Sequence, residues 1–330
     1  MKKAMTLFFA LVLALGLTAC GAGAPNETPA EPTEMNVYVL AGPTGIGALP
    51  LWAKADGGEE LQNVYHVTMT GANDEIVAAV SGGAADIACV ATNMAATLYN
   101  KTEGGVKVLA VNTLGVLSVL TNGTDVSTVA DLQGKTVYSP GQGANPEYIL
   151  RYVLQGNGLD PESDVEIRFV GEGSELLGVW QTEPDAVILA PQPVATTLQM
   201  QYEGAKTALD MTEEWDKVSG GESTLMMGCV IVRTAFLEEH PAAVEGFLED
   251  YAASIETARN DVEGTAALCQ TYGIIPKAAL AAKAIPYCGL TYVSGTQMRE
   301  QLSGYLSVMF DANPKSVGGK LPGDDFYYGA

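Results

Sequence analysis

Four short segments of small and polar residues could contact a ligand through hydrogen bonds. They are residues 42–47, 71–73, 91–93 and 140–145, and each follows a predicted strand and precedes a predicted helix. In open α/β sheets, ligands bind beyond the strand ends, where helix N-terminal amides are free. The side chains here are mostly amides and hydroxyls, which donate and accept hydrogen bonds. The segments therefore predict a site for a small polar organic molecule rather than a bare inorganic anion.

The candidate contact residues lie in these four segments, in the middle of an apolar run at 106–120, and in a second polar loop at 191–193. They are Thr44, Gly45, Ile46, Gly71, Asn73, Thr92, Asn93, Thr113, Gln142, Gly143, Asn145 and Gln192. Trp52 or Tyr138 could stack on a ring of the ligand. Hardly any fixed positive charge falls in the loops, so we expect binding to depend weakly on salt.

Patterns that would carry catalysis, a cofactor or a metal are missing. Residues 141–143 are glycine-rich but lack the lysine and hydroxyl of a phosphate-binding loop, and residues 172–175 lack the second glycine of a nucleophile elbow. The only histidines, His66 and His240, lie far apart, and no cysteine pair has zinc spacing. We therefore predict no catalytic residue, no cofactor and no metal site.

The N-terminus has the layout of an export signal. Lys2 and Lys3 precede an apolar run at 7–17, which is too short to span a bilayer comfortably and which ends in Leu-Thr-Ala-Cys. Small residues before Cys20 resemble the bacterial lipobox, so we expect a signal peptide at 1–19, lipid on Cys20 and a disordered tether at 20–34. The alternative is an ordinary signal peptide cut within residues 19–24.

The charge composition argues against two classes of binding partner. Acidic residues outnumber basic ones 39 to 17, which argues against binding nucleic acid or an anionic membrane surface through a basic patch. Cys89 and Cys229 lie in apolar runs and are interpreted as buried thiols. Cys269 and Cys288 could form a disulfide or remain free, because spacing alone does not decide it.

Strands and helices alternate regularly from residue 35 to residue 200. This alternation predicts an α/β fold with a parallel sheet. The predicted strands of the first part are residues 35–41, 64–69 and 86–90, and the predicted helices are residues 49–55, 73–80 and 94–99, with Asn73 and the Thr92–Asn93 pair as N-caps. A second series runs from 135 to 200, and residues after 235 are mostly helical.

Two long apolar runs, at 106–120 and 225–232, indicate that the chain crosses between two domains. We expect lobe 1 to contain residues 35–114 and 226–330 and lobe 2, inserted into it, to contain residues 115–225. Residues 71–98 and 171–198 also share a pattern, in which Ala-Ala-Thr-Leu matches Ala-Thr-Thr-Leu at the end. Chance similarity is the alternative, but equivalent units would make loops 91–93 and 191–193 face each other across a cleft.

Several of these motifs together resemble a known family. The lipobox, Gly42-Pro43-Thr44-Gly45, residues 88–93, and residues 131–137 followed by 140–143 are similar to the solute-binding lipoproteins of ABC importers, especially the nitrate/sulfonate/taurine and thiamine-precursor binding group. The resemblance implies a periplasmic-binding-protein-like type II fold with two α/β lobes joined by a two-segment hinge. It also implies an extracytoplasmic monomer that holds a small-molecule solute, delivers it to a permease with its ATPase, and touches the membrane only through its lipid.

Two other functions stay open from the sequence. One is an enzyme of the same fold that acts on a pyrimidine or a small acid, although the chain has no cysteine-rich stretch like that of the fungal thiamine-pyrimidine synthases. The other is a sensor or adhesion lipoprotein without a transporter. Neighbouring permease and ATPase genes would favour import.

Overall fold

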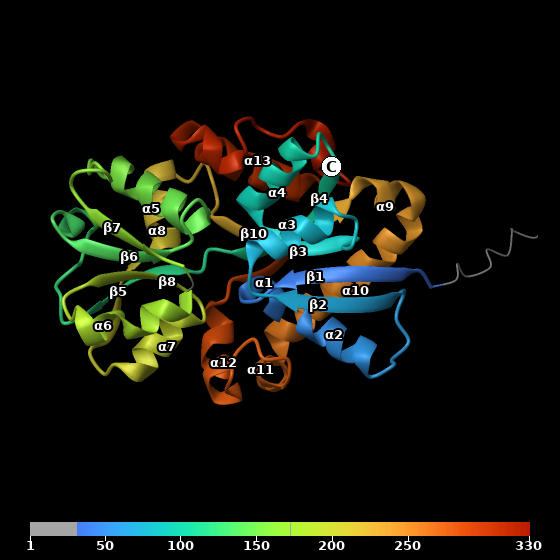
Figure 1. Cartoon of the computed structure of the whole chain (residues 1–330), viewed down its shortest axis with the longest axis horizontal. Helices are drawn as coiled ribbons and strands as arrows, with labels where there is room; N and C mark the ends of the chain where they lie inside the picture. The colour runs from blue at the N-terminus through green and yellow to red at the C-terminus, as the bar shows by residue number, and fades with distance from the viewer. Residues whose placement is uncertain (1–31, 172) are drawn as a thin grey trace, which may run out of the picture. The chain divides into compact units, whose positions relative to one another are not determined.

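The computed structural model describes residues 32–171 and 173–330 (Figure 1). The predicted signal peptide, Cys20 and residues 20–31 of the predicted tether lie outside the described residues. Glu34, which the sequence assigned to the tether, instead begins strand β1 (Glu34–Leu40). Residues 33–330 form one compact unit with hydrophobic cores of its own.

The first sheet has six strands in the order β11-β4-β10-β3-β1-β2. Its other strands are β2 (Val64–Thr70), β3 (Ile87–Ala91), β4 (Val106–Leu114), β10 (Met226–Arg233) and β11 (Leu290–Ser294). Strands β1, β2 and β3 are parallel, as the sequence predicts. Strand β10 is antiparallel to β3 and β4, and β11 is antiparallel to β4, so the whole sheet is mixed; no direction was predicted for these later strands.

The second sheet has five strands in the order β7-β6-β8-β5-β9. They are β5 (Leu117–Asn122), β6 (Thr136–Pro140), β7 (Glu166–Val170), β8 (Val187–Pro191) and β9 (Ala205–Asp210). Strand β6 is parallel to β7 and β8, whereas β5 is antiparallel to β8 and β9. The run at 106–120 is therefore two strands, β4 and β5, in two different sheets, as predicted.

Helices cover both faces of each sheet. They are α1 (Pro43–Ile46), α2 (Leu49–Asp56), α3 (Asn73–Ser81), α4 (Thr92–Lys101), α5 (Asn145–Gly156), α6 (Val179–Thr182), α7 (Val194–Gln201), α8 (Met211–Ser219), α9 (Thr234–Glu239), α10 (Pro241–Asn260), α11 (Val262–Thr271), α12 (Ala278–Ala284) and α13 (Gly295–Ala312). In Figure 1, α5 and α8 lie on one face of the second sheet, and α6 and α7 lie on the other. The 3₁₀ helix η2 (Gly173–Gly178) comes directly before α6.

The hydrophobic core is continuous between the two sheets on one face and divided on the opposite face. On one face a single cluster, which we call the shared core, contains Val108 of β4, Val137 of β6, Trp215 of α8 and Tyr305 of α13. On the other face the side chains form separate clusters: two belong to the first sheet and its helices, and one to β8, α6 and α7. The two sheets are thus joined by continuous packing on one face only.

All four cysteines of the described chain are buried and free. The disulfide considered for Cys269 and Cys288 is absent, and both side chains pack in the apolar cluster between α11 and α12. Within residues 32–171 and 173–330, no helix has both the length and the apolar character needed to cross a bilayer.

Candidate functional site

A cavity of about 600 Å³ lies where strands of both sheets end. Leu40 at the end of β1 and Ala91 at the end of β3 line it from the first sheet, and Pro140 of β6 and Pro191 of β8 line it from the second. Parallel strands bring their carboxyl ends and the following loops to one edge, which explains why segments far apart in sequence meet here. Ala91 of the loop 91–93 and all three residues of the loop 191–193 line the same cavity, which agrees in part with the expectation that these loops face each other.

Half of the sequence-predicted contact residues line this cavity. They are Thr44, Gly71, Asn73, Thr113, Asn145 and Gln192.

The other six do not line it. Ile46 is fully buried in the cluster with α11 and α12, and Gly45 packs so closely that a Cβ would lie 2.8 Å from the Leu40 carbonyl oxygen. The Thr92 hydroxyl donates to the Met226 carbonyl at 2.6 Å, and the Asn93 amide donates to the Ser316 carbonyl at 3.3 Å. Gln142 and Gly143 are exposed outside the cavity.

The helices that begin at the cavity have unusual N-caps. The N-cap residues of α3, α4 and α5 are Ala72, Ala91 and Ala144, so the predicted caps Asn73 and Thr92 are instead the first helical residues. An alanine side chain cannot accept a hydrogen bond from the first turn. By contrast, Asp210 caps α8 with its carboxylate. The first-turn amides of α3, α4 and α5 thus have no side-chain acceptor from their N-cap residues.

Two polar side chains of the cavity are held in fixed orientations. Thr44 donates its hydroxyl proton to the Leu40 carbonyl at 3.0 Å, which leaves its oxygen as an acceptor. The Gln192 Oε1 atom accepts from the Thr196 backbone N–H at 3.3 Å and from the Thr196 hydroxyl at 2.8 Å. Because a backbone N–H can only donate, the Gln192 Nε2 group is the end left for a ligand.

The rest of the lining is apolar or uncharged. Val116, Val194, Met227 and Ile274 contribute apolar surface, and five prolines add to it. No charged side chain occurs among the described residues that line the cavity. Neither Trp52 nor Tyr138, whose rings could have stacked on a ligand, lines the cavity, and Trp52 packs on Tyr272 with ring centroids 4.3 Å apart.

A buried, uncharged network supports the floor of the cavity. The Thr113 hydroxyl donates to Asn112 Oδ1 at 3.0 Å, and Asn112 Nδ2 donates to the Tyr251 hydroxyl at 2.9 Å. The Tyr251 hydroxyl lies 3.5 Å from Cys89 Sγ. Burial raises the pKa of Tyr251 and raises the pKa of Cys89 to about 12, so both stay neutral at physiological pH. Sequence reasoning missed this network, although a polar Asn112 inside an apolar run was a usable signal.

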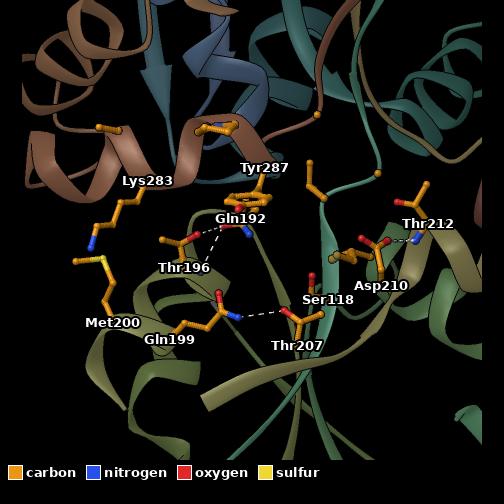
Figure 2. Close-up of a pocket in the computed structure, with 16 residues that line it drawn as sticks. Ser118, Gln192, Thr196, Gln199, Met200, Thr207, Asp210, Thr212, Lys283 and Tyr287 are labelled. Carbon is orange, nitrogen blue, oxygen red and sulfur yellow. Dashed lines mark hydrogen bonds between the residues drawn. The ribbon is translucent and has the colours of Figure 1, made fainter. Parts of the chain in front are cut away.

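A second cavity of about 830 Å³ lies beside the first and shares Val116 and Gln192 with it (Figure 2). Figure 2 shows Thr196 and Gln199 of α7 on one side and Lys283 and Tyr287, in and after α12, on the other. Nothing in the sequence pattern pointed to this cavity.

Solved structures with the same fold include several binding components of importers. An ABC transporter from Parabacteroides distasonis is 20% identical and superposes with a TM-score of 0.74, over 89% of this chain and 98% of that one. The periplasmic aliphatic sulphonate binding protein SsuA from Escherichia coli is 15% identical, with a TM-score of 0.68 over 87% and 96%. The alkanesulfonate-binding protein SsuA from Xanthomonas axonopodis pv. citri, bound to MOPS, is 14% identical, with a TM-score of 0.65 over 89% and 96%.

These likenesses confirm the periplasmic-binding-protein-like fold expected from the sequence. No curated protein matches the chain by sequence. The family model described as NMT1/THI5 like matches residues 64–264, which is more than half of the chain, and the chain therefore belongs to the NMT1/THI5-like family.

Proposed function

We propose that this protein is an extracytoplasmic solute-binding lipoprotein that captures a small polar organic molecule and delivers it to an ABC import permease and its ATPase. The observation that carries this proposal is the cavity at the strand ends of both sheets, with uncapped helix starts and fixed amide and hydroxyl groups. The protein acts as a monomer, binds no nucleic acid and contacts the membrane only through lipid on Cys20.

The ligand is held between two lobes, one formed by residues 35–114 and 226–330 and the other by residues 115–225. The chain leaves the first sheet after β4 and returns to it at β10, so two short segments connect the lobes. Two-segment connections of this kind absorb hinge motions that close lobes around a ligand.

The ligand class follows from the lining. Nitrate and simple sulfonates without a further polar group only accept hydrogen bonds, and the cavity offers them free amides but no cationic side chain among its described residues. The Thr44 oxygen offers an acceptor that such anions cannot use. A neutral molecule with both donors and acceptors satisfies both kinds of group, whereas each buried group left unpaired costs about 1–3 kcal/mol.

We expect binding of a neutral polar compound with weak salt dependence. The unit 33–330 is tested by thermal shift against sulfonates, pyrimidines, nucleosides, flavins and amino-acid derivatives, and hits are titrated by calorimetry at low and high ionic strength. The Kd should change by less than about twofold, because little of the binding is charge pairing. Tight binding of nitrate or sulfate alone, or a steep loss of affinity with salt, would contradict the proposed ligand class.

We expect Cys20→Ala to release the protein from the membrane. Stable anchoring needs two acyl signals, and the lipid on Cys20 is the only anchor proposed. Fractionation of cells followed by immunoblotting measures the change, with Ala22→Ser, which leaves Cys20 in place, as the matched control. A Cys20→Ala chain that stays in the membrane fraction would show that the lipobox interpretation is wrong.

A further inference from the structure

The second cavity, of about 830 Å³, carries charged side chains, whereas the described residues that line the strand-end cavity carry none. Lys283 of α12 and Asp210 at the end of β9 both line it. Among the described residues, the two cavities share only Val116 and Gln192. A molecule that pairs with the groups of one cavity is therefore poorly matched to the other.

Both charged groups have capacity left for a ligand. The Asp210 Oδ1 atom accepts from the backbone amides of Thr212 and Glu213 at 2.8 and 3.4 Å, which fixes the carboxylate at the start of α8. Within residues 32–171 and 173–330, no donor bonds the Asp210 Oδ2 atom and no carboxylate pairs with Lys283 Nζ. Figure 2 shows Lys283 to one side of Tyr287 and Asp210 to the other. The cavity therefore offers a cation and an anion at separate ends.

Uncharged polar groups of the same cavity provide both donors and acceptors. Gln199 Nε2 donates to Thr207 Oγ1 at 3.1 Å, which leaves Gln199 Oε1 as an acceptor and the Thr207 hydroxyl as a donor. The Gln192 Nε2 group is also left to donate, because Thr196 occupies its Oε1 atom. A peptide backbone carries one donor and one acceptor per residue, so it pairs with a mixed set of this kind.

Exposed apolar surface also gathers at this cavity. Of the four large hydrophobic side chains that are exposed in the described chain, two line it: Met200, which is 50% exposed, and Tyr287, which is 67% exposed. A tyrosine ring and a thioether both present broad apolar contact area, and the flexible methionine adapts to its partner. Apolar side chains that are exposed together in a hollow indicate a binding surface.

We propose that this cavity is a second ligand site, which binds a short zwitterionic peptide with an apolar side chain. The peptide's α-amino group pairs with Asp210 and its carboxylate with Lys283. Its backbone bonds Gln199 and Thr207, and its side chain packs on Tyr287. The site is separate from that of the solute proposed above. Because two charge pairs hold the peptide, its binding weakens with salt, unlike binding at the strand ends.

Calorimetry of the unit 33–330 with a peptide length series tests the site. The probes are Ala-Tyr, Ala-Tyr-Ala and Ala-Tyr-Ala-Ala, which span about 3.3–3.6 Å per residue when extended, so the series finds the length that reaches both charges. We expect at least one probe to bind with a Kd of about 1 mM or tighter. Its Kd should rise at least about threefold between low and high ionic strength. Absence of binding by all three probes, or binding that is independent of salt, would overturn the proposal.

Charge-removing variants assign the two ends of the peptide. Asp210→Asn keeps a side chain that caps α8, and Lys283→Gln keeps the length of the lysine, so both should fold. Each should raise the Kd of the best probe at least about threefold. The N-acetylated probe should be insensitive to Asp210→Asn, and the C-terminally amidated probe to Lys283→Gln. The controls are Asp216→Asn in α8 and Lys277→Gln just before α12, because neither residue lines the cavity. Equal effects of cavity and control variants would overturn the proposal.

The two binding sites can be tested separately. A solute found in the thermal-shift screen should still bind once per chain when the unit 33–330 is saturated with the best peptide probe. Loss of solute binding under these conditions would show a common site, which overturns the second site and leaves the proposed solute binding intact. Peptide binding that responds to Asp210→Asn and Lys283→Gln, in a protein for which the screen finds no solute, would support the second site and contradict only the proposed function.

Discussion

Replacing Asp86 with alanine is expected to lower the free energy of unfolding by about 3–5 kcal/mol, the cost of breaking a buried ion pair. Asp86 is 7% exposed, and its Oδ1 atom accepts from the Arg233 guanidinium at 2.7 Å. Its Oδ2 atom accepts from the backbone and side-chain amides of Asn36 at 2.9 and 3.0 Å. The substitution leaves the partly buried Arg233 without its counter-charge and removes a tie between β1, β3 and β10.

Asp324→Ala is the matched control. Asp324 pairs with Arg299 at 2.8 Å, but its side chain is 86% exposed, so loss of this surface pair should cost about 0–1 kcal/mol. Chemical denaturation of both variants of unit 33–330 measures the difference. Asp86 directly precedes β3, away from the cavity at the strand's other end, so folded Asp86→Ala should keep its ligand affinity. Equal destabilisation by the two substitutions would show that the buried pair contributes no more than a surface one.

Gly228→Ala is expected to damage stability and ligand binding together. Gly228 lies on β10 beneath the cavity, and an added Cβ would meet Thr44 Cγ2 at 2.4 Å, Asn112 Oδ1 at 2.7 Å and Thr113 Cβ at 3.0 Å. Overpacking of this kind costs about 1–3 kcal/mol, because backbone and side chains must shift. Thr44 and Thr113 both line the cavity, so the same shift should weaken binding of any hit from the ligand screen.

Gly71→Ala is the control for this prediction. Gly71 also lines the cavity, but no heavy atom lies within 4 Å of the position of its added Cβ. Its stability should therefore change by less than about 0.5 kcal/mol. Denaturation midpoints and ligand-induced thermal shifts of the two variants give the comparison. If Gly228→Ala retains wild-type stability and affinity, the floor of the cavity is more adaptable than its packing indicates.

The elements of the first part of the chain were predictable because their patterns are local. Strand β3 (Ile87–Ala91) is a continuous apolar run that was predicted at 86–90, and helix α3 (Asn73–Ser81) was predicted at 73–80. Strand β9 and helix α8 were not predicted, because Ala205–Asp210 lacks a regular alternation of buried and exposed residues and Met211–Ser219 is short and polar. The antiparallel pairing of β10 was also not predicted, since strand direction depends on where the chain returns from the second sheet, and no local sequence pattern records it.

The candidate site was also predictable only in part. Loops at strand ends were predictable from small and polar residues, and this brought Thr44, Asn73 and Gln192 to the cavity. Side-chain direction was not predictable, so Ile46 was expected at the cavity although it points into the core. Partners distant in sequence, such as Tyr305 for Asn145, are invisible to pattern reasoning because they are 160 residues apart.

The shared core has a consequence for the order in which the chain acquires its structure during synthesis. Trp215 of α8 and the apolar face of α5 are buried partly by α13, which begins only at Gly295. Domains generally fold as units as they emerge, but residues 115–225 must wait for nearly the whole chain before this face is covered. Folding intermediates that lack the last 36 residues would expose Trp215. Packing of α13 therefore buries side chains of both sheets' helices in a single late step.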